Sequence, residues 1–245
     1  MTNQAVYGIS KNARAEPKVK WLLEKIQEGD SDLAIAIGGD GEAFAAFHNY
    51  PDKKLLHLRL DQSAGFYSAM RLKDVDDRTI ERIAKDDYRI LELPLLKVGL
   101  DDGFLRVLND ASLVREPNGK SGKFNIDIDG DSLKQSADGV IVCTPSGSSA
   151  HSFSANGPLI SWGLPAYGVT IQAATRGLRS FSYVVPGDKI TQVTSDYECF
   201  LEYDGASIPL PAGSSVSFCL AGRKAKIVQL DRESQLQKFT RIMLP

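Results

Sequence analysis

The chain has 245 residues, of which 42% are hydrophobic and 24% charged, a composition typical of a globular protein with a sizeable core. Lysine and arginine total 29 against 31 for aspartate and glutamate, so no basic excess favours nucleic acid as a partner. The longest apolar runs fall short of the roughly 18 residues that a membrane span needs, and the first residues lack the features of a signal peptide. We therefore expect a cytoplasmic protein that binds neither nucleic acid nor membrane.

The cysteines are few and widely spaced. Cys143, Cys199 and Cys219 are an odd number, and each lies in an apolar or alternating stretch. Their spacing matches no metal-binding motif. We expect reduced thiols in the core of the protein.

Strands and helices alternate in the first part of the chain. Each apolar run of strand length is followed by a segment with apolar residues at helical spacing. This alternation predicts an open sheet with crossover helices. The expected strands cover residues 6–10, 32–37 and 55–60, and the expected helices cover residues 17–28, 42–48 and 75–85.

After about residue 88 the pattern changes to the period-two alternation of strands. Residues 88–100 and 104–109 flank an Asp-Asp-Gly turn and predict a hairpin. We therefore expect an α/β domain over residues 1–95 and a β-rich domain over residues 96–245, whose C-terminal tail packs back on the first domain. Further strands are expected at residues 124–128, 139–144, 167–173, 189–194, 197–203, 216–221 and 226–230, and a final helix at 233–243.

The sequence Gly38-Gly39-Asp40-Gly41 joins an expected strand to an expected helix. Glycines let backbone N–H groups approach a phosphate, and a helix N-terminus favours negative charge. A carboxylate beside bound phosphate is costly unless it accepts a proton or a metal neutralises the charge, and phosphoryl transfer to a hydroxyl needs such a proton acceptor. The alternative is a tight turn in which Asp40 caps the helix. The loop is not a Walker motif, because Glu42 follows it and no Gly-Lys-Ser/Thr does.

A segment rich in small hydroxyl residues, residues 144–151, follows the expected strand at 139–144. Its backbone and hydroxyl groups could hydrogen-bond a ribose or a base edge, or it could be a solvated loop. Ser146 lacks the flanking glycines of a nucleophile elbow, and His151 has no carboxylate partner nearby in sequence. Hydrolase chemistry is therefore not expected.

Two shorter segments have binding and structural interpretations that both stay open. Asn109-Asp110 could read an adenine edge and ribose hydroxyls, or could end a strand as a turn. Gly65-Phe66-Tyr67 could form an aromatic wall for a base, or a buried corner.

The order of these motifs resembles that of the NAD kinase family over nearly the whole chain. This resemblance implies an α/β N-terminal domain with the glycine loop and a β-rich C-terminal domain. It implies transfer of the ATP γ-phosphoryl group to the 2′-hydroxyl of the adenosine ribose of NAD, giving NADP, with a divalent metal, Mg²⁺, on the triphosphate. It leaves open whether the donor is ATP alone or also inorganic polyphosphate, and it implies a homodimer or homotetramer. The motifs are Gly38–Gly41, Gly65–Tyr67, Asn109–Asp110, Asp138–Gly139, residues 144–151 and Asp204–Gly205.

The resemblance also implies roles for individual residues. Asp40 is expected as the general base, and Gly38, Gly39 and Gly41 as the phosphate loop. The first domain then holds the phosphates and the second holds the dinucleotide, with no metal ligand assigned. The expected NAD-binding residues are Phe66, Tyr67, Asn109, Asp110, Asp138, Ser146, Ser149, Ala150 and His151.

Several positions depart from the family pattern. Glu42 replaces a threonine, Asp110 a glutamate and His151 a tyrosine, and Leu60-Asp61-Gln62 stands where the family has Asn/His-Thr-Gly. An expected Arg-Pro is also missing around residues 180–185. These departures leave two alternatives to a working kinase: an NAD(P)-binding regulatory paralogue, and a phosphotransferase of the lipid-kinase type with a similar glycine loop.

Overall fold

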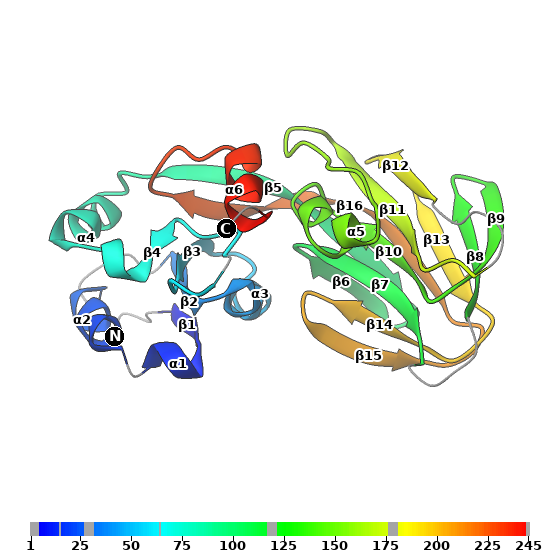
Figure 1. Cartoon of the computed structure of the whole chain (residues 1–245), viewed down its shortest axis with the longest axis horizontal. Coiled ribbons are helices and arrows are strands. Elements are labelled where there is room, and N and C mark those ends of the chain that lie inside the picture. Colours follow the sequence, from blue (N-terminus) through cyan, green and yellow to red (C-terminus); the bar gives the residue numbers. More distant parts are fainter. Residues whose placement is uncertain are drawn as a thin grey trace. The chain divides into compact units, whose positions relative to one another are not determined.

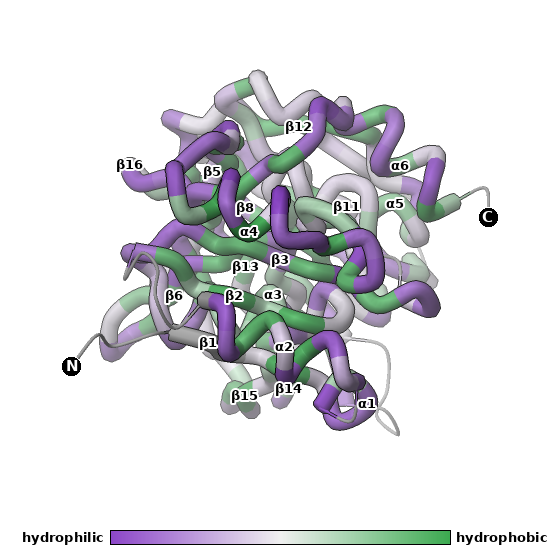
Figure 2. Tube along the Cα trace, turned by 90° about the vertical axis from the view of Figure 1, so that its left-hand side faces the viewer, coloured by the Kyte–Doolittle hydropathy of each residue, from purple (hydrophilic) through white to green (hydrophobic). Residues whose placement is uncertain are grey.

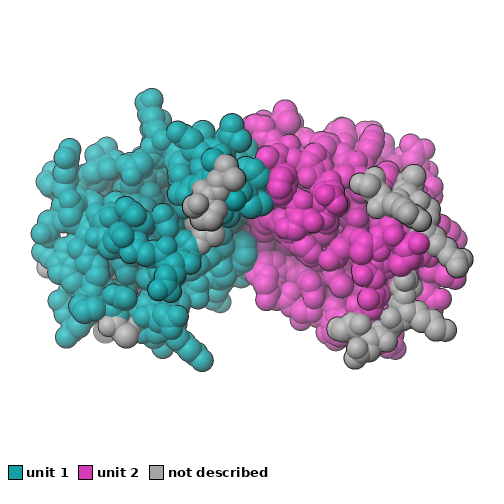
Figure 3. All heavy atoms as spheres, viewed as in Figure 1, with its two compact units in different colours: residues 1–92, 225–245 teal, residues 93–224 magenta. Residues whose placement is uncertain are grey.

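The computed structural model describes residues 5–14, 16–26, 32–63, 65–116, 122–175 and 181–243. The chain divides into two compact units, coloured in Figure 3: unit 1 is Met1–Glu92 with Ala225–Pro245, and unit 2 is Leu93–Lys224. Unit 1 alternates strands and helices, whereas unit 2 consists mostly of strands, which confirms the predicted fold class. The domain bounds at residues 1–95 and 96–245 stay a prediction, and the expected helical residues 27–28 lie outside the described residues.

Unit 1 is built on a parallel sheet. β1 (Ala5–Ile9), β2 (Leu33–Gly38) and β3 (Lys54–Arg59) pair in that order and run in the same direction (Figure 1). β4 (Met70–Arg71) and the last part of β16 (Ser215–Gln229) also pair parallel to β3. All six residues of β2 are buried, and its hydrophobic run is visible in Figure 2, as expected for a strand covered on both faces. Because the strands are parallel, their carboxyl ends meet at one edge of the sheet.

Local sequence signals explain where the helices of unit 1 begin. Pro17 opens one helix, at a position where its missing N–H costs nothing. Asp76 caps another, because its side chain accepts the Thr79 N–H over 2.7 Å. The helices are α1 (Lys11–Arg14), α2 (Pro17–Ile26), α3 (Asp40–Asn49), the 3-10 turn η1 (Leu72–Asp74), α4 (Asp77–Ala84) and α6 (Gln235–Met243).

The core of unit 1 joins segments from both ends of its sequence. Leu33, Ile35 and Ile37 of β2 pack in one buried cluster with Val228 and Leu230, which lie about two hundred residues later. The unit is therefore discontinuous in sequence.

Unit 2 consists of antiparallel strands whose buried faces share one hydrophobic cluster. One sheet is six-stranded, in the order β12-β11-β10-β7-β14-β15. The order of the other strands is β16-β13-β8-β9, with β5 pairing both β16 and β6. The bounds are β5 (Arg89–Leu100), β6 (Gly103–Val107), β7 (Asp110–Arg115), β8 (Gly122–Ile128), β9 (Asp131–Ala137), β10 (Gly139–Cys143), η2 (Gly147–Ser149), α5 (His151–Ser154), β11 (Ala166–Gln172), β12 (Ser182–Pro186), β13 (Thr191–Ser195), β14 (Cys199–Tyr203) and β15 (Ala206–Leu210).

Some elements differ from the expectation. Strands β7, β9, β12 and β15 were not predicted, and the strands expected at residues 216–221 and 226–230 are one strand, β16, which ends at Gln229. The three cysteines are free, and Cys143 and Cys199 are buried, whereas Cys219 is only partly so. None of the described helices is long and apolar enough to cross a membrane.

Candidate functional site

The glycine loop lies where β2 ends and α3 begins. Gly38 is the last residue of β2, Gly39 is the N-cap of α3 in extended conformation, and Asp40 is the first helical residue. Gly38 has φ 149°, and a Cβ added there would lie 2.6 Å from Glu42 Oε2. The loop therefore needs glycine at this position.

Asp40 ties this loop to the segment after β3. Its Oδ2 accepts the backbone N–H of Phe66 over 2.9 Å, and its Oδ1 accepts that of Tyr67 over 3.2 Å. The side chain caps no helix, since Gly39 is the N-cap and makes no side-chain cap bond. The carboxylate is held in place by backbone donors and is still 26% exposed, so a ligand can reach it.

Two further ionisable side chains lie around Asp40 in unit 1, and neither was expected from the sequence. His57 of β3 is fully buried, with Nδ1 3.8 Å from Asp40 Oδ1. Lys238 of α6 is almost fully buried and donates from Nζ to the Ser68 carbonyl over 2.7 Å. Burial lowers the pKa of Lys238 to about 8, although Glu233 and Asp40 act to raise it. A single histidine among leucines, or a lysine in an amphipathic helix, gives no sequence signal for such a role.

The side chain of Glu42 accepts a hydrogen bond from one of the backbone N–H groups of the glycine loop. The Gly39 N–H donates to Glu42 Oε2 over 2.8 Å, three residues along the chain. A carboxylate at this position suits the positive end of the helix dipole. The anion that meets the glycine loop in this structure is therefore the protein's own side chain.

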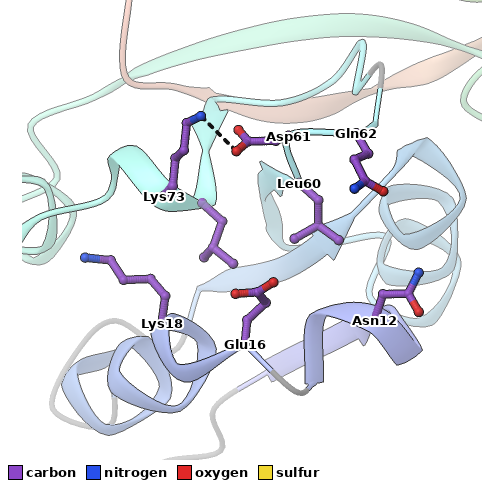
Figure 4. Close-up of a pocket in the computed structure, with 8 residues that line it drawn as sticks. Asn12, Glu16, Lys18, Leu60, Asp61, Gln62 and Lys73 are labelled. Atoms are coloured by element: carbon purple, nitrogen blue, oxygen red, sulfur yellow. Dashed lines mark ion pairs between the residues drawn. The ribbon is translucent and has the colours of Figure 1, made fainter.

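A pocket of about 420 Å³ opens in unit 1 at the carboxyl edge of the parallel strands. Figure 4 shows Asn12 from α1 on one side and Leu60, Asp61 and Gln62, which follow β3, on the other. These residues follow β1 and β3, whose neighbour β2 ends in the glycine loop. Ligands of open α/β sheets bind at this edge.

The pocket carries charges of both signs. Lys73 Nζ lies 2.8 Å from Asp61 Oδ2, the ion pair drawn in Figure 4, and this bond lowers the pKa of Asp61. Glu16 and Lys18 line the same pocket. Leu60, Asp61 and Gln62 stand out in the sequence as departures from the family pattern, whereas nothing in the sequence indicates a role for the two lysines.

In unit 2, Asp204 organises the segment that enters β7. Its Oδ2 accepts the Leu108 N–H over 2.7 Å and its Oδ1 accepts the Asn109 N–H over 2.8 Å. Asn109 Nδ2 in turn donates to Asp110 Oδ2 over 2.7 Å. Asn109 and Asp110 thus lie at the start of a strand, and their side chains contact each other.

The hydroxyl-rich segment packs against the same backbone. Thr144 Oγ1 donates to the Leu108 carbonyl over 2.8 Å, and Ser146 Oγ does so over 3.1 Å. A Cβ added at Gly147 would lie 2.0 Å from the Asn109 carbonyl oxygen, so only glycine permits this approach. Ser146 is fully buried, and the segment is therefore not a solvated loop.

Asp110 is the ionisable group most perturbed at this place. Burial, together with the charge of Asp204, raises the pKa of Asp110 to about 7, and the bond from Asn109 only partly opposes this. The carboxyl group can therefore change protonation state near neutral pH.

The remaining predicted site residues lie in different places. Phe66 and Tyr67 form a buried corner in unit 1, with ring centroids 5.5 Å apart. Ser149, Ala150 and His151 are partly buried where η2 meets α5.

Asp138 is separated from the other residues of unit 2. It precedes β10, whereas Thr144 follows that strand, so the length of β10 lies between them. Asp138 Oδ1 accepts a bond from Arg115 Nε over 2.5 Å. This ion pair engages the carboxylate at the end of the sheet away from Asn109 and Asp110.

The described residues do not form a metal-binding cage. No group of three or more histidine, cysteine, aspartate or glutamate side chains suited to a metal ion occurs in the part of the chain that the structure describes. The described side chains therefore do not fit a metal ion held by the protein alone.

A family model and curated relatives match the chain. The model for the ATP-NAD kinase C-terminal domain matches residues 108–230. An NAD kinase of Thermoplasma volcanium is 32% identical over 217 residues, covering 85% of this chain and 77% of its own. An NAD kinase of Porphyromonas gingivalis is 29% identical over 241 residues, covering 93% and 81%. For NAD kinase 1 of Oceanobacillus iheyensis, 34% identical, the match spans 57% of that relative's length.

Two solved structures share the fold. The yeast NADH kinase complexed with NADH has a TM-score of 0.76 at 24% identity, covering 87% of this chain and 65% of its own. An NAD kinase from Archaeoglobus fulgidus in complex with ATP has a TM-score of 0.76 at 18% identity, covering 94% and 97%. At this identity the likeness concerns the fold.

Proposed function

The chain belongs to the ATP-NAD kinase family, and from this premise we propose that it transfers the γ-phosphoryl group of ATP to the 2′-hydroxyl of the adenosine ribose of NAD, giving NADP. The observation that carries this proposal is Asp40, a partly exposed carboxylate at the mouth of a glycine loop, held by the N–H groups of Phe66 and Tyr67. Such a group can accept the proton of an attacking hydroxyl.

In this reaction, the roles of unit 1 are to position the reacting groups and to supply one base. Asp40 takes the proton of the ribose hydroxyl, and the oxygen then attacks the γ-phosphorus as ADP leaves. The backbone of the glycine loop can approach the phosphates closely, because no side chain intervenes at Gly38, Gly39 and Gly41. Since the residues that the structure describes hold no metal cage, a divalent ion such as Mg²⁺ would enter with the triphosphate, whose charge it neutralises.

The pocket beside the glycine loop is our candidate for the donor nucleotide. It opens at the carboxyl edge of the sheet that also bears Gly38, and it has a volume of about 420 Å³. Lys18 supplies positive charge to a polyanion there, and Lys73 would do so once the polyanion displaces Asp61 from it. The same charges suit inorganic polyphosphate, which we propose as an alternative donor.

Unit 2 is our candidate for holding NAD. Asn109 and Asp110 offer an amide and a carboxyl group side by side for an adenine edge and ribose hydroxyls. We place Ser146, Ser149, Ala150 and His151 beside this ligand as well, because their segment is bonded to the backbone before β7. Asp138 lies apart from these residues and would meet a different part of the ligand. Following the family resemblance, we also propose a cytoplasmic homodimer or homotetramer.

One observation favours a second candidate, an NAD(P)-binding regulatory paralogue with little transfer. Glu42 takes the Gly39 N–H and places a negative charge where the donor phosphates would bind. If the triphosphate cannot displace this carboxylate, the dinucleotide would bind without being phosphorylated.

The test is to measure NADP formation by the purified protein from NAD, ATP and Mg²⁺, with NAD binding followed by calorimetry. NADP formed at the rate of ADP release would support the kinase. NAD binding without NADP would support the regulatory paralogue. If neither occurs, diacylglycerol and sphingosine are the next acceptors to offer, because lipid kinases have a similar glycine loop.

A further inference from the structure

His57 is a buried, ionisable side chain for which the proposed reaction has no role so far. It lies in β3 between Leu56 and Leu58, and its side chain is fully buried. A buried imidazole needs hydrogen-bond partners for both of its ring nitrogens, or it loses their hydration without compensation. Its two nitrogens have very different surroundings.

The geometry decides which nitrogen carries the hydrogen. His57 Nε2 lies 3.2 Å from the Gly38 carbonyl oxygen. A carbonyl can only accept, so Nε2 must be the protonated nitrogen and Nδ1 keeps a lone pair. Nδ1 has no hydrogen-bond partner within the described part of the chain.

The unprotonated Nδ1 of His57 faces Asp40, the candidate base. It lies 3.8 Å from Asp40 Oδ1, which is about 1 Å beyond hydrogen-bond distance. While Asp40 is ionised, neither of these two atoms carries a hydrogen that it could donate to the other. No hydrogen bond therefore draws them together. A proton on Oδ1 would make the two atoms a donor and an acceptor.

The surroundings keep the imidazole neutral. Burial lowers the pKa of His57, and this effect is larger than those of the charges that face it. Asp40 and Glu42 of α3 and the Gly38 carbonyl of β2 act to raise this pKa, while Lys238 of α6 acts to lower it. A neutral ring is the form that can accept a proton at Nδ1.

We propose that His57 is a positioning residue for Asp40, whose Nδ1 accepts a hydrogen bond from the protonated Asp40 carboxyl group formed during transfer. The proposal rests on the proposed function. In the step, the ribose O–H bond breaks and its electron pair forms the new P–O bond. The P–O bond to ADP breaks, its electron pair leaves with ADP, and the proton on Asp40 Oδ1 is shared with His57 until it passes to water.

This arrangement offsets an effect of the two backbone donors. The Phe66 and Tyr67 N–H groups stabilise the Asp40 carboxylate and so oppose its uptake of a proton. An acceptor on the third side stabilises the protonated form instead. His57 thereby stabilises the product of the proton transfer to Asp40.

The first test needs no turnover. The chain has three histidines, so the ¹⁵N resonances of a histidine-labelled sample are few. We expect His57 with its hydrogen on Nε2, and an Nδ1 resonance that shifts as the pH is lowered in the wild type but not in Asp40→Asn. A hydrogen on Nδ1, or no shift with pH, would overturn the proposal. Lack of NADP formation by the wild type would refute the proposed function and would leave this readout intact.

The second test uses matched variants. His57→Phe removes both nitrogens but keeps a ring, His57→Asn keeps an acceptor near Nδ1, and His48→Phe makes the same exchange on an exposed position of α3. We expect kcat to fall about 10-fold in His57→Phe, with the acid limb of the pH profile of kcat/KM moving to lower pH. The KM values stay unchanged, His57→Asn restores part of the rate, and His48→Phe behaves as wild type. A fall in rate with an unmoved acid limb would mean a merely structural role.

Discussion

The backbone N–H of Phe66 donates a hydrogen bond to Asp40 Oδ2 over 2.9 Å, and its neighbour Tyr67 donates to the other oxygen. These bonds join the N-terminus of α3 to the loop after β3. They fix the orientation of the carboxylate before any ligand arrives, which is the condition for an effective general base.

Asp40→Asn should abolish transfer while leaving NAD binding nearly intact. The amide cannot accept a proton, so kcat should fall at least about 10²-fold. One of the two backbone donors loses its acceptor, and we expect a cost of about 1–2 kcal/mol in the free energy of unfolding. The comparison is Asp77→Asn, whose side chain is 80% exposed. If the substitution at Asp40 removed NAD binding and rate together, the base assignment would be wrong.

Glu42→Gln should increase the affinity for ATP. The glutamine can still accept the Gly39 N–H, but it removes the negative charge beside the donor phosphates. We expect about 10-fold tighter binding of ATP or inorganic triphosphate in a calorimetric titration.

Two further variants complete the measurement at Glu42. Glu42→Thr frees the Gly39 N–H as well, at a cost of about 1 kcal/mol from the lost cap. Glu24→Gln, an exposed position of α2, controls for the change in net charge. Equal ATP affinities in Glu42→Gln and the wild type would show that the carboxylate does not oppose the donor.

Gly147→Ala should destabilise unit 2. The added Cβ would lie 2.0 Å from the Asn109 carbonyl oxygen, so one segment must move. We expect a loss of about 3 kcal/mol in the free energy of unfolding and weaker NAD binding, measured by urea unfolding and calorimetry. Gly163→Ala is the control, because nothing lies within 4 Å of its added Cβ. Similar stability of the two variants would contradict the close approach.

Asp110→Asn should stabilise the protein at pH 8 more than at pH 5. The pKa of Asp110 is raised to about 7 in the folded chain, against roughly 3.9 when unfolded, so the folded state binds more protons in this interval. In the wild type, the contribution of Asp110 to the free energy of unfolding is fully present below about pH 4 and is lost as the pH rises through about 7. Asparagine does not titrate, so its advantage should grow over the same interval. The measurement is urea unfolding at both pH values, with the exposed Asp131→Asn as the comparison. A stability gain of Asp110→Asn over the wild type that is equal at pH 5 and pH 8 would refute this prediction.

The parts of the fold that could be predicted are those with strong periodicity. The apolar run of β2 ending in Gly38-Gly39 predicts a buried strand followed by a helix, and the structure has both. Strand β7 was missed because Asn109-Asp110 is typical of a turn, whereas Asp204 holds this segment from a position almost a hundred residues away. Long-range bonds of this kind leave no local pattern.

The sequence predicts the glycine loop of the candidate site but not the side chains around it. The sequence indicates a carboxylate beside a phosphate loop, but it cannot indicate that Glu42 turns back to Gly39. His57 and Lys238 reach the Asp40 neighbourhood from β3 and α6, and neither belongs to a motif. Burial gives these two side chains their chemistry, and burial is decided by tertiary packing.

The discontinuity of unit 1 affects how the protein can fold during synthesis. Leu33 and Ile35 leave the ribosome early, but Val228 and Leu230, which share their cluster, emerge only after all of unit 2. Unit 2 is a continuous stretch and can complete its core first, whereas the apolar face of β2 must wait for the end of β16. A nascent chain halted near residue 224 would therefore expose the strand that leads into Asp40, which makes this interval the one in which a chaperone is most needed.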